Sequence, residues 1–403
     1  MKKLLCIIFI TIVLLPLNTY AINYPELHYK NAIVYDVTDE KILYELNSEE
    51  LSSIASLTKI MTIITAIEKN NNPNKVITYT QNMKNKVALY ASVAGFKVGD
   101  KLTFDDLLYA AMLPSGADAT VALAITTSNS IEEFVNEMNL LAKKIGMNNT
   151  NFVNVHGLDE KNHYSTAKDI QILIEYALKN EKFKKVYTTK EYILSTGKKI
   201  KSTVKKQSDK FGLDTSKIIG SKTGFTGNAG LCISVLMNYK EHEIVFVTLN
   251  APTTSTTIPY NISDTLDLIS FIENSYNLQE IIEKNQFEKN IKVTNSNIDN
   301  YKIKSTKEVT LFLENDYNKD DIKIIYTGKQ KLSYKNKKGE KIGTIKYYYQ
   351  QKEIASEEVY LNKELKINYL KVIKENIDII IIITTVITAI VLFIFAIKIL
   401  KSK

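Results

Sequence analysis

The chain has 403 residues, of which 45% are hydrophobic and 24% charged, and its formal net charge is +8. This composition is that of a globular protein and excludes a fibrous or disordered chain, while the length exceeds one ordinary compact domain. All 52 basic residues are lysines scattered among 44 acidic residues, which argues against nucleic-acid binding and favours contact with an anionic surface such as a bacterial membrane. The two cysteines and four histidines lack metal-site spacing, so we expect no metal site and no cofactor.

The N-terminal segment has the three-part pattern of a secretory signal peptide. Lys2 and Lys3 precede an apolar run, a proline ends that run, and the small residue Ala21 follows. The run is short for a membrane span, so we expect a signal peptide over residues 1–21 that is cleaved after Ala21. An uncleaved anchor helix is the alternative.

The C-terminal segment has the length and composition of a membrane span. Residues 379–397 carry no charge and would cover roughly 28 Å as a helix, about one hydrocarbon core. Lysines follow this run, and positive residues prefer the cytoplasmic side. We therefore predict a transmembrane helix over 377–398, a cytoplasmic tail over 399–403 and the body of the protein on the outer face of a bacterial plasma membrane. A helix lying on the bilayer surface is disfavoured, because the segment is apolar on all sides.

Between these ends, the periodicity predicts an α+β domain over 22–280 and a small all-β domain over 288–365. The strands expected in the first domain lie at 33–44 (two strands around a turn at 38–40), 218–222, 230–238 and 243–249. Its expected helices are 56–68, 104–124 with a break at 114–116, 131–145, 166–179 and 265–276. Strands at both ends with helices between them indicate an antiparallel sheet beside a helical cluster. The strands expected in the second domain are 309–313, 322–326, 343–349 and 354–361.

The segment Ser56-Leu57-Thr58-Lys59 begins the first predicted helix. Residues three apart lie on one face of a helix, so the Ser56 hydroxyl and the Lys59 amine can meet. A serine hydroxyl needs an adjacent base to act as a nucleophile, and a lysine is such a base only when its pKa is lowered. Taken alone, the pair is more simply read as a helix cap followed by a solvated lysine.

Two further segments carry compatible chemistry. Lys222-Thr223-Gly224 ends a predicted edge strand, where a lysine and a hydroxyl can hold a carboxylate and the glycine lets a ligand backbone approach. Ser115 lies in a loop between helices, where a hydroxyl could relay a proton to a leaving amine. The plainer readings are an ordinary strand end and a turn serine. Together and in this order, however, S-x-x-K, a loop serine and K-T-G are the motif set of penicillin-binding proteins.

Longer stretches around these motifs resemble the low-molecular-weight penicillin-binding proteins that are D-alanyl-D-alanine carboxypeptidases, serine peptidase family S11. The matching stretches are residues 55–62, 106–109, 113–116, 154–158, 163–169 and 220–226. The resemblance extends over roughly 24–365 and is specific, because several motifs occur in the right order. It implies a penicillin-binding, β-lactamase-like transpeptidase fold followed by a β domain. It also implies removal of the terminal D-alanine from peptidoglycan stem peptides ending in D-Ala-D-Ala, with β-lactams as covalent inhibitors.

The resemblance further implies the roles of three catalytic residues. Ser56 would attack the carbonyl of the penultimate D-alanine and Lys59 would accept its proton. Ser115 would help to pass that proton to the departing D-alanine. Water would then hydrolyse the acyl-enzyme.

The residues implied for substrate binding lie on the K-T-G segment. Lys222 and Thr223 would bind the terminal carboxylate, beside Gly224. The backbone N–H groups of Ser56 and Phe225 would form the oxyanion hole, where preorganised donors stabilise the transition state. The 154–156 turn would border the cleft and is most simply a structural loop.

Two departures from the family pattern keep other functions open. Ala117 stands where the family usually has asparagine, and no arginine follows Ala251-Pro252. The first departure motivates an alternative in which the protein is a catalytically weakened wall-binding protein. A β-lactamase is a second alternative, but it would need a deacylating glutamate for which the sequence offers no convincing loop.

Overall fold

The computed structural model describes residues 25–70, 72, 74–254 and 259–400. Contacts within the chain divide it between Ser275 and Tyr276 into two compact units. The predicted signal peptide over 1–21 lies outside the described residues, as do positions 255–257 of the segment that lacks the family arginine.

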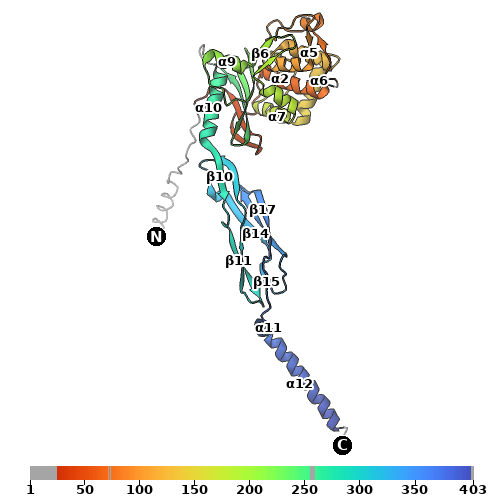
Figure 1. Ribbon diagram of the computed structural model, residues 1–403, viewed down its shortest axis with the longest axis vertical. Coiled ribbons are helices and arrows are strands. Elements are labelled where there is room, and N and C mark those ends of the chain that lie inside the picture. Colours follow the sequence, from red (N-terminus) through yellow and green to blue (C-terminus); the bar gives the residue numbers. More distant parts are fainter. Residues whose placement is uncertain (1–24, 71, 73, 255–258, 401–403) are drawn as a thin grey trace, which may run out of the picture. The chain divides into compact units, whose positions relative to one another are not determined.

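A five-stranded antiparallel sheet forms the framework of the first unit (Figure 1). Its strands are β1 (Asn31–Asp36), β2 (Lys41–Leu46), β7 (Gly220–Thr226), β8 (Gly230–Tyr239) and β9 (His242–Ala251). Their order across the sheet is β2-β1-β9-β8-β7, so strands from the two ends of the unit pair at its centre, as Ile33 does with Val247. The predicted antiparallel sheet is confirmed, and β7, which carries the K-T-G segment, is an edge strand of it.

Most helices of this unit lie between β2 and β7 in the chain. They are the 3-10 helix η1 (Ala55–Leu57), α2 (Thr58–Lys69), α3 (Gln81–Asn85), α4 (Phe104–Met112), α5 (Ala117–Thr127), α6 (Ile131–Ile145), α7 (Ala167–Leu178), α8 (Glu181–Thr188) and α9 (Thr203–Phe211). Two short antiparallel strand pairs lie among them, namely β3 (Ile77–Thr78) with β4 (Lys101–Leu102) and β5 (Glu191–Ile193) with β6 (Lys199–Lys201). Helix α10 (Tyr260–Ser275) closes the unit.

Five helices of this unit differ from the sequence-based expectation, and two of them, α3 and α8, were not predicted. The helix expected from Ser56 begins as the 3-10 turn η1, and α-helical geometry starts only at Thr58. Helix α10 begins at Tyr260 rather than 265, because Pro259 is well suited to the start of a helix. Helix α9 was not predicted either, since Val204 is its only buried residue and leaves no apolar period to recognise.

Helix α2 is the central helix of the cluster. Every residue from Thr58 to Ala66 is buried, including Lys59, of which only 2% is exposed. The helix packs against α4, α5, α6 and α7, so neighbours cover it on several sides. A lysine amine in this position has little access to bulk water, and its hydrogen-bond partners must come from the protein.

The second unit is an all-β domain, as predicted. Its strands are β10 (Tyr276–Ile282), β11 (Glu288–Thr294), β12 (Asn300–Lys304), β13 (Val309–Glu314), β14 (Ile322–Gly328), β15 (Lys331–Ser333), β16 (Lys341–Tyr349) and β17 (Lys352–Tyr360). They form three small sheets, β10-β13, β12-β11-β15 and β14-β16-β17. Inward-facing side chains, among them Ile291, Tyr347 and Leu361, share one hydrophobic core.

Two helices follow the β domain, α11 (Tyr369–Glu375) and α12 (Ile377–Leu400). Residues Ile377–Lys398 form a helix long and apolar enough to cross a membrane, which matches the predicted span. Every turn of this helix exposes apolar side chains, and the hydrocarbon core of a bilayer would cover this apolar surface.

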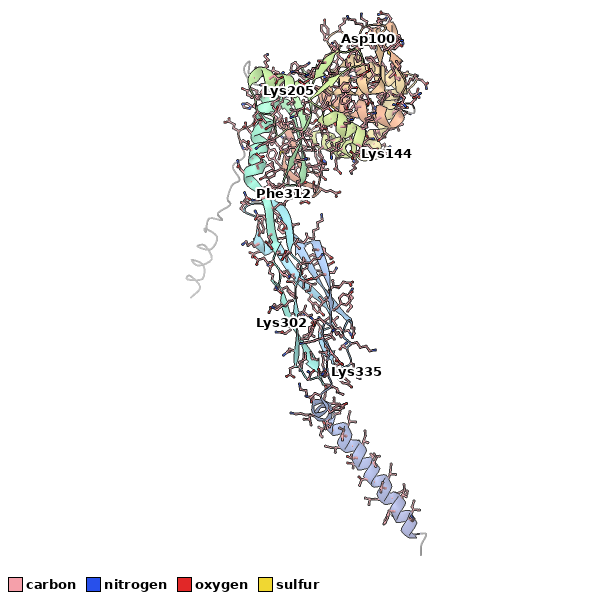
Figure 2. All side chains as sticks on the ribbon, viewed as in Figure 1. Asp100, Lys144, Lys205, Lys302, Phe312 and Lys335 are labelled. Atoms are coloured by element: carbon pink, nitrogen blue, oxygen red, sulfur yellow. The ribbon has the colours of Figure 1, made fainter. Side chains whose placement is uncertain are left out.

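The lysines are spread over the surfaces of both units rather than gathered on one face. Lys144 in the first unit and Lys302 and Lys335 in the second are exposed examples (Figure 2). Several lysines pair with carboxylates, as Lys69 does with Glu137 at 2.5 Å. A protein that binds nucleic acid instead concentrates its basic residues in a patch or stripe.

Candidate active site

The Ser56 hydroxyl and the Lys59 amine meet, as their spacing predicts. Lys59 Nζ donates to Ser56 Oγ at 2.7 Å and to the carbonyl oxygen of His156 at 2.6 Å. Burial lowers the pKa of Lys59 to about 7, although the carboxylate of Asp118 opposes this shift. An amine with such a pKa is substantially unprotonated at neutral pH, so it can accept a proton from Ser56.

A second buried lysine pairs with the loop serine. Lys222 Nζ donates to Ser115 Oγ at 2.9 Å and to the carbonyl oxygen of Thr223 at 2.6 Å. Burial lowers the pKa of Lys222 well below its ordinary value, and the charge of Lys59 lowers it further. A carboxylate bound beside Lys222 would favour its protonated form.

Two residues of the site have unusual backbone conformations. Ala55 and Ser115 have φ values of 46° and 63°, which non-glycine residues rarely adopt and which concentrate at functional sites. Two glycines permit close approach here. A Cβ at Gly157 would lie 1.9 Å from the Ala55 carbonyl oxygen, and one at Gly224 would lie 3.0 Å from the Ser56 nitrogen. The end of β7 is therefore held directly against η1.

The predicted site residues line or adjoin a cleft of 260 Å³. Of these residues, its lining includes Ser56, Ser115, Thr223, Gly224 and Phe225. Lys59 and Lys222 are buried beside it, and each amine reaches one of the two serines. The structure thus brings all seven predicted residues together. Among the described residues that line the cleft there is no aspartate or glutamate, the kind of side chain that a β-lactamase of the alternative reading would need.

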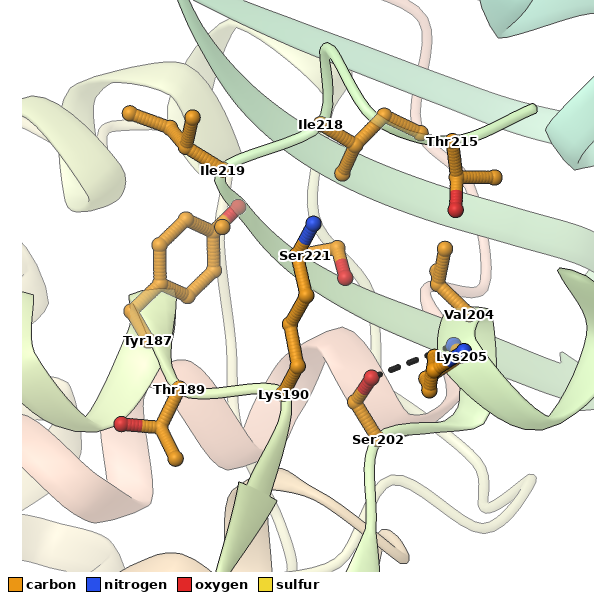
Figure 3. A pocket seen from close by; sticks show the side chains of 11 residues that line it. Tyr187, Thr189, Lys190, Ser202, Val204, Lys205, Thr215, Ile218, Ile219 and Ser221 are labelled. Atoms are coloured by element: carbon orange, nitrogen blue, oxygen red, sulfur yellow. Dashed lines mark hydrogen bonds between the residues drawn. The ribbon is translucent and has the colours of Figure 1, made fainter.

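A separate hollow at the start of β7 is not a candidate site. Its walls include Tyr187, Lys190 and Ser202 (Figure 3), and its volume of 10 Å³ has room for about one water molecule. The dashed contact in this view is structural, because Ser202 Oγ accepts the Lys205 N–H at 3.2 Å and so caps α9.

One functional contact had no sequence signal. Asn154 Oδ1 accepts the N–H of Gly157 at 2.7 Å and that of His156 at 3.2 Å, which fixes the turn that presents the His156 carbonyl to Lys59. The sequence analysis placed this turn at the border of the cleft. It could not identify the His156 carbonyl as the partner of Lys59, because every residue has a backbone carbonyl and only the fold determines which one the amine meets. Burial and the charge of Lys59 lower the pKa of the His156 imidazole to about 4.

Ala117 is fully buried at the start of α5, where its N–H donates to the Ser92 carbonyl oxygen at 2.7 Å. The next residue, Asp118, points to a different segment. Its carboxylate oxygens accept the N–H groups of Ala94 and Gly95, each at 2.8 Å. The Asp118 carboxylate therefore holds the loop at residues 94–95 in place.

The fold and the paired lysine–serine contacts define a penicillin-binding type of serine hydrolase. A family model described as D-alanyl-D-alanine carboxypeptidase, peptidase S11, matches residues 18–253. A second, described as the C-terminal domain of penicillin-binding protein 5, matches residues 276–366. The chain belongs to the peptidase S11 family of D-alanyl-D-alanine carboxypeptidases, whose members act through an acyl-enzyme on a serine.

Individual relatives agree with this assignment. D-alanyl-D-alanine carboxypeptidase DacF of Bacillus subtilis is 32% identical over 269 residues, 66% of this chain and 67% of the relative. DacC of Escherichia coli is 31% identical over 231 residues, 55% of this chain and 56% of the relative. The matches to these two curated relatives therefore span between about half and two thirds of their length.

Solved structures show the same fold. Penicillin-binding protein 5 of Haemophilus influenzae superposes with a TM-score of 0.61 at 22% identity, covering 86% of this chain and all of that one (100%). The Streptomyces K15 DD-transpeptidase superposes with a TM-score of 0.56 at 28% identity, covering 62% of this chain and 98% of its own. The first likeness includes the β domain and the second is confined to a shorter part of the chain.

Proposed function

We propose that this protein releases the terminal D-alanine from peptidoglycan stem peptides ending in D-Ala-D-Ala, through an acyl-enzyme on Ser56. One observation carries the proposal above all, the 2.7 Å contact between Lys59 Nζ and Ser56 Oγ beside the cleft. A serine with a buried amine within hydrogen-bond distance is a nucleophile with its base in place.

In the first half of the reaction, Ser56 Oγ attacks the carbonyl carbon of the penultimate D-alanine and its proton passes to neutral Lys59. The negative charge that develops on the carbonyl oxygen needs preorganised donors, each worth about 3–4 kcal/mol in comparable sites. We assign this part to the backbone N–H groups of Ser56 and Phe225. The close packing of Gly224 against the Ser56 nitrogen supports the assignment, because it holds the two segments side by side.

The second lysine–serine pair, Lys222 with Ser115, is suited to bind and protonate the departing D-alanine. We assign the terminal carboxylate of the peptide to Lys222 and Thr223, since carboxylate binding favours the charged form of Lys222. Ser115, which accepts from Lys222 at 2.9 Å, then relays the proton taken up by Lys59 to the amine of the departing D-alanine, as the peptide C–N bond breaks and the ester on Ser56 forms. Water completes the cycle by hydrolysing the ester on Ser56. β-Lactams would acylate the same serine.

We further propose that α12 spans the plasma membrane and leaves the catalytic unit on the outer face. The support is the apolar stretch Ile377–Lys398 together with the lysines that follow it, which favour the cytoplasmic side. A signal peptide at the other end of the sequence would export the body of the chain.

Two measurements on one preparation test the proposed activity. The purified protein is labelled with fluorescent penicillin, and free D-alanine is then assayed after incubation with a pentapeptide ending in D-Ala-D-Ala. We expect covalent labelling and D-alanine release. Labelling without release would favour the weakened wall-binding protein, whereas rapid turnover of penicillin would favour a β-lactamase.

A further inference from the structure

Three hydrogen bonds, two of them fully buried, join a distant loop to the residue that precedes the nucleophile. The N–H of Val153 donates to His163 Nδ1 at 3.2 Å. His163 Nε2 lies 2.8 Å from Thr58 Oγ1, and Thr58 Oγ1 donates to the carbonyl oxygen of Ala55 at 2.9 Å. The series therefore ends on the peptide bond between Ala55 and Ser56.

The direction of each bond follows from the chemistry of the imidazole. Because Nδ1 accepts a hydrogen bond, the proton of the neutral ring lies on Nε2, which must donate to Thr58 Oγ1. The hydroxyl is then free to give its own proton to Ala55. Burial lowers the pKa of His163 to about 4, so the ring is neutral near pH 7 and keeps this tautomer.

The peptide plane that this series holds is the one that carries the Ser56 N–H. A trans peptide is planar, so a fixed Ala55 carbonyl also fixes the direction of the N–H on the other side of the same bond. The conformation needs support, because Ala55 has a φ of 46°, which is costly for a residue with a side chain. Gly157 lies against the same carbonyl oxygen, where a Cβ would come within 1.9 Å.

We propose that His163 and Thr58 are positioning residues that fix the Ala55–Ser56 peptide plane and thereby aim the Ser56 N–H at the developing oxyanion. This inference rests on the proposed function, which assigns that N–H to the oxyanion hole. Neither residue is among the described residues that line the cleft, and Thr58 is fully buried, so both act through Ala55 rather than on the substrate.

A hydroxyl deletion on α2 tests the inference with a matched control one turn away. Thr58→Val keeps the shape of the side chain and removes its donor, whereas Thr58→Ser keeps the donor. The control is Thr62→Val. Thr62 Oγ1 is equally buried and donates to the Val155 carbonyl oxygen at 2.8 Å and, more weakly, to the Thr58 backbone carbonyl oxygen at 3.4 Å, without contact to Ala55. Acylation by a chromogenic β-lactam, the KM and kcat for a D-Ala-D-Ala peptide, and the unfolding temperature are measured for all three variants.

We expect Thr58→Val to lower the acylation rate and kcat by about ten- to a hundredfold, with KM changed by less than about twofold. This is less than the roughly hundred- to thousandfold cost of removing an oxyanion donor, because the Ser56 N–H is misdirected rather than lost. Thr58→Ser should remain near wild type. Thr62→Val should lower the unfolding temperature as much as Thr58→Val does, yet acylate normally. If Thr58→Val acylates as fast as Thr62→Val, or if both lose activity in proportion to stability, the positioning role is wrong.

A second pair of variants covers the case in which Thr58→Val does not fold. His163→Gln can still present an N–H near the position of Nε2, whereas His163→Leu cannot. The proposal expects the glutamine variant to recover most of the acylation rate that the leucine variant loses, and equal rates would overturn it. A wild-type protein that is not acylated at all would instead refute the proposed function, so the two failures are distinguishable.

Discussion

Lys59 Nζ donates a hydrogen bond to Ser56 Oγ over 2.7 Å, from a side chain of which only 2% is exposed. The spacing places the amine, and the burial makes it a base, because a lysine in water would hold its proton at neutral pH. Burying the Lys59 amine costs free energy, and the same burial lowers its pKa so that it can act as a base.

The pH dependence of acylation should report the titration of this amine. Lys59 accepts a proton only when it is neutral, and its pKa is lowered to about 7. The second-order rate constant for acylation should therefore rise about tenfold per pH unit below pH 7 and level off above it. A stopped-flow profile with a chromogenic β-lactam measures this. A rate that keeps rising to about pH 10, the usual range for lysine, would show that Lys59 is not the base.

Lys59→Arg should reduce acylation by about a hundredfold or more, since a guanidinium does not give up its proton at useful pH. The matched control is Lys69→Arg on the same helix, where the lysine is 44% exposed and pairs with Glu137. Fluorescent penicillin labelling compares the two variants. Near-normal acylation of Lys59→Arg would show that Lys59 contributes only its charge and is not the base.

Ala117→Asn should change peptide turnover by tenfold or less in either direction. The family asparagine would donate to the substrate, and one such hydrogen bond is worth about 1–3 kcal/mol. The proposed nucleophile, base and oxyanion donors are other residues, and a bound water can substitute for the amide. Release of D-alanine from a pentapeptide measures the effect. An inactive wild type that asparagine rescues outright would support the weakened wall-binding protein.

A chain truncated before about Lys371 should be soluble and should still react with penicillin. The predicted site residues all lie in the first unit, and the removed part contains the apolar stretch Ile377–Lys398. Truncation also removes the contacts of Lys371 with the Ser296 carbonyl oxygen and with Asp299, an exposed ion pair that contributes little stability. Fractionation and labelling measure both properties. A truncated protein that stays with the membranes would contradict the anchor assignment.

The parts of the site that sequence predicted well are those encoded locally. The contact between Ser56 and Lys59 follows from a spacing of three residues, and the break between α4 and α5 follows from Pro114. The contact of Lys222 with Ser115 joins residues 107 positions apart, so only the order of the motifs suggested it.

Other features could not be predicted because their chemistry is carried by the backbone or by tertiary packing. The His156 carbonyl acts through the backbone. The link from His163 to Thr58 spans 105 positions, and the matching stretches that contain these residues do not indicate that the two side chains meet. In the second unit, β11 pairs in parallel with β15, from Lys292 with Lys331 onward, a partner that neither alternation nor turn signals specify.

Mass spectrometry of the wild type and of Ser56→Ala tests directly whether Ser56 is the residue that is acylated. Both proteins are incubated with a β-lactam and with a D-Ala-D-Ala peptide, and the modified residue is located by proteolysis. With the β-lactam we expect one acyl group per wild-type molecule, on the proteolytic fragment that contains Ser56. With the D-Ala-D-Ala peptide we expect less of an adduct at the same residue, because water hydrolyses that ester. Neither adduct should form on Ser56→Ala, in which Lys59 still has the His156 carbonyl as a partner. Full acylation of Ser56→Ala, or a wild-type adduct on another residue, would contradict the proposed mechanism.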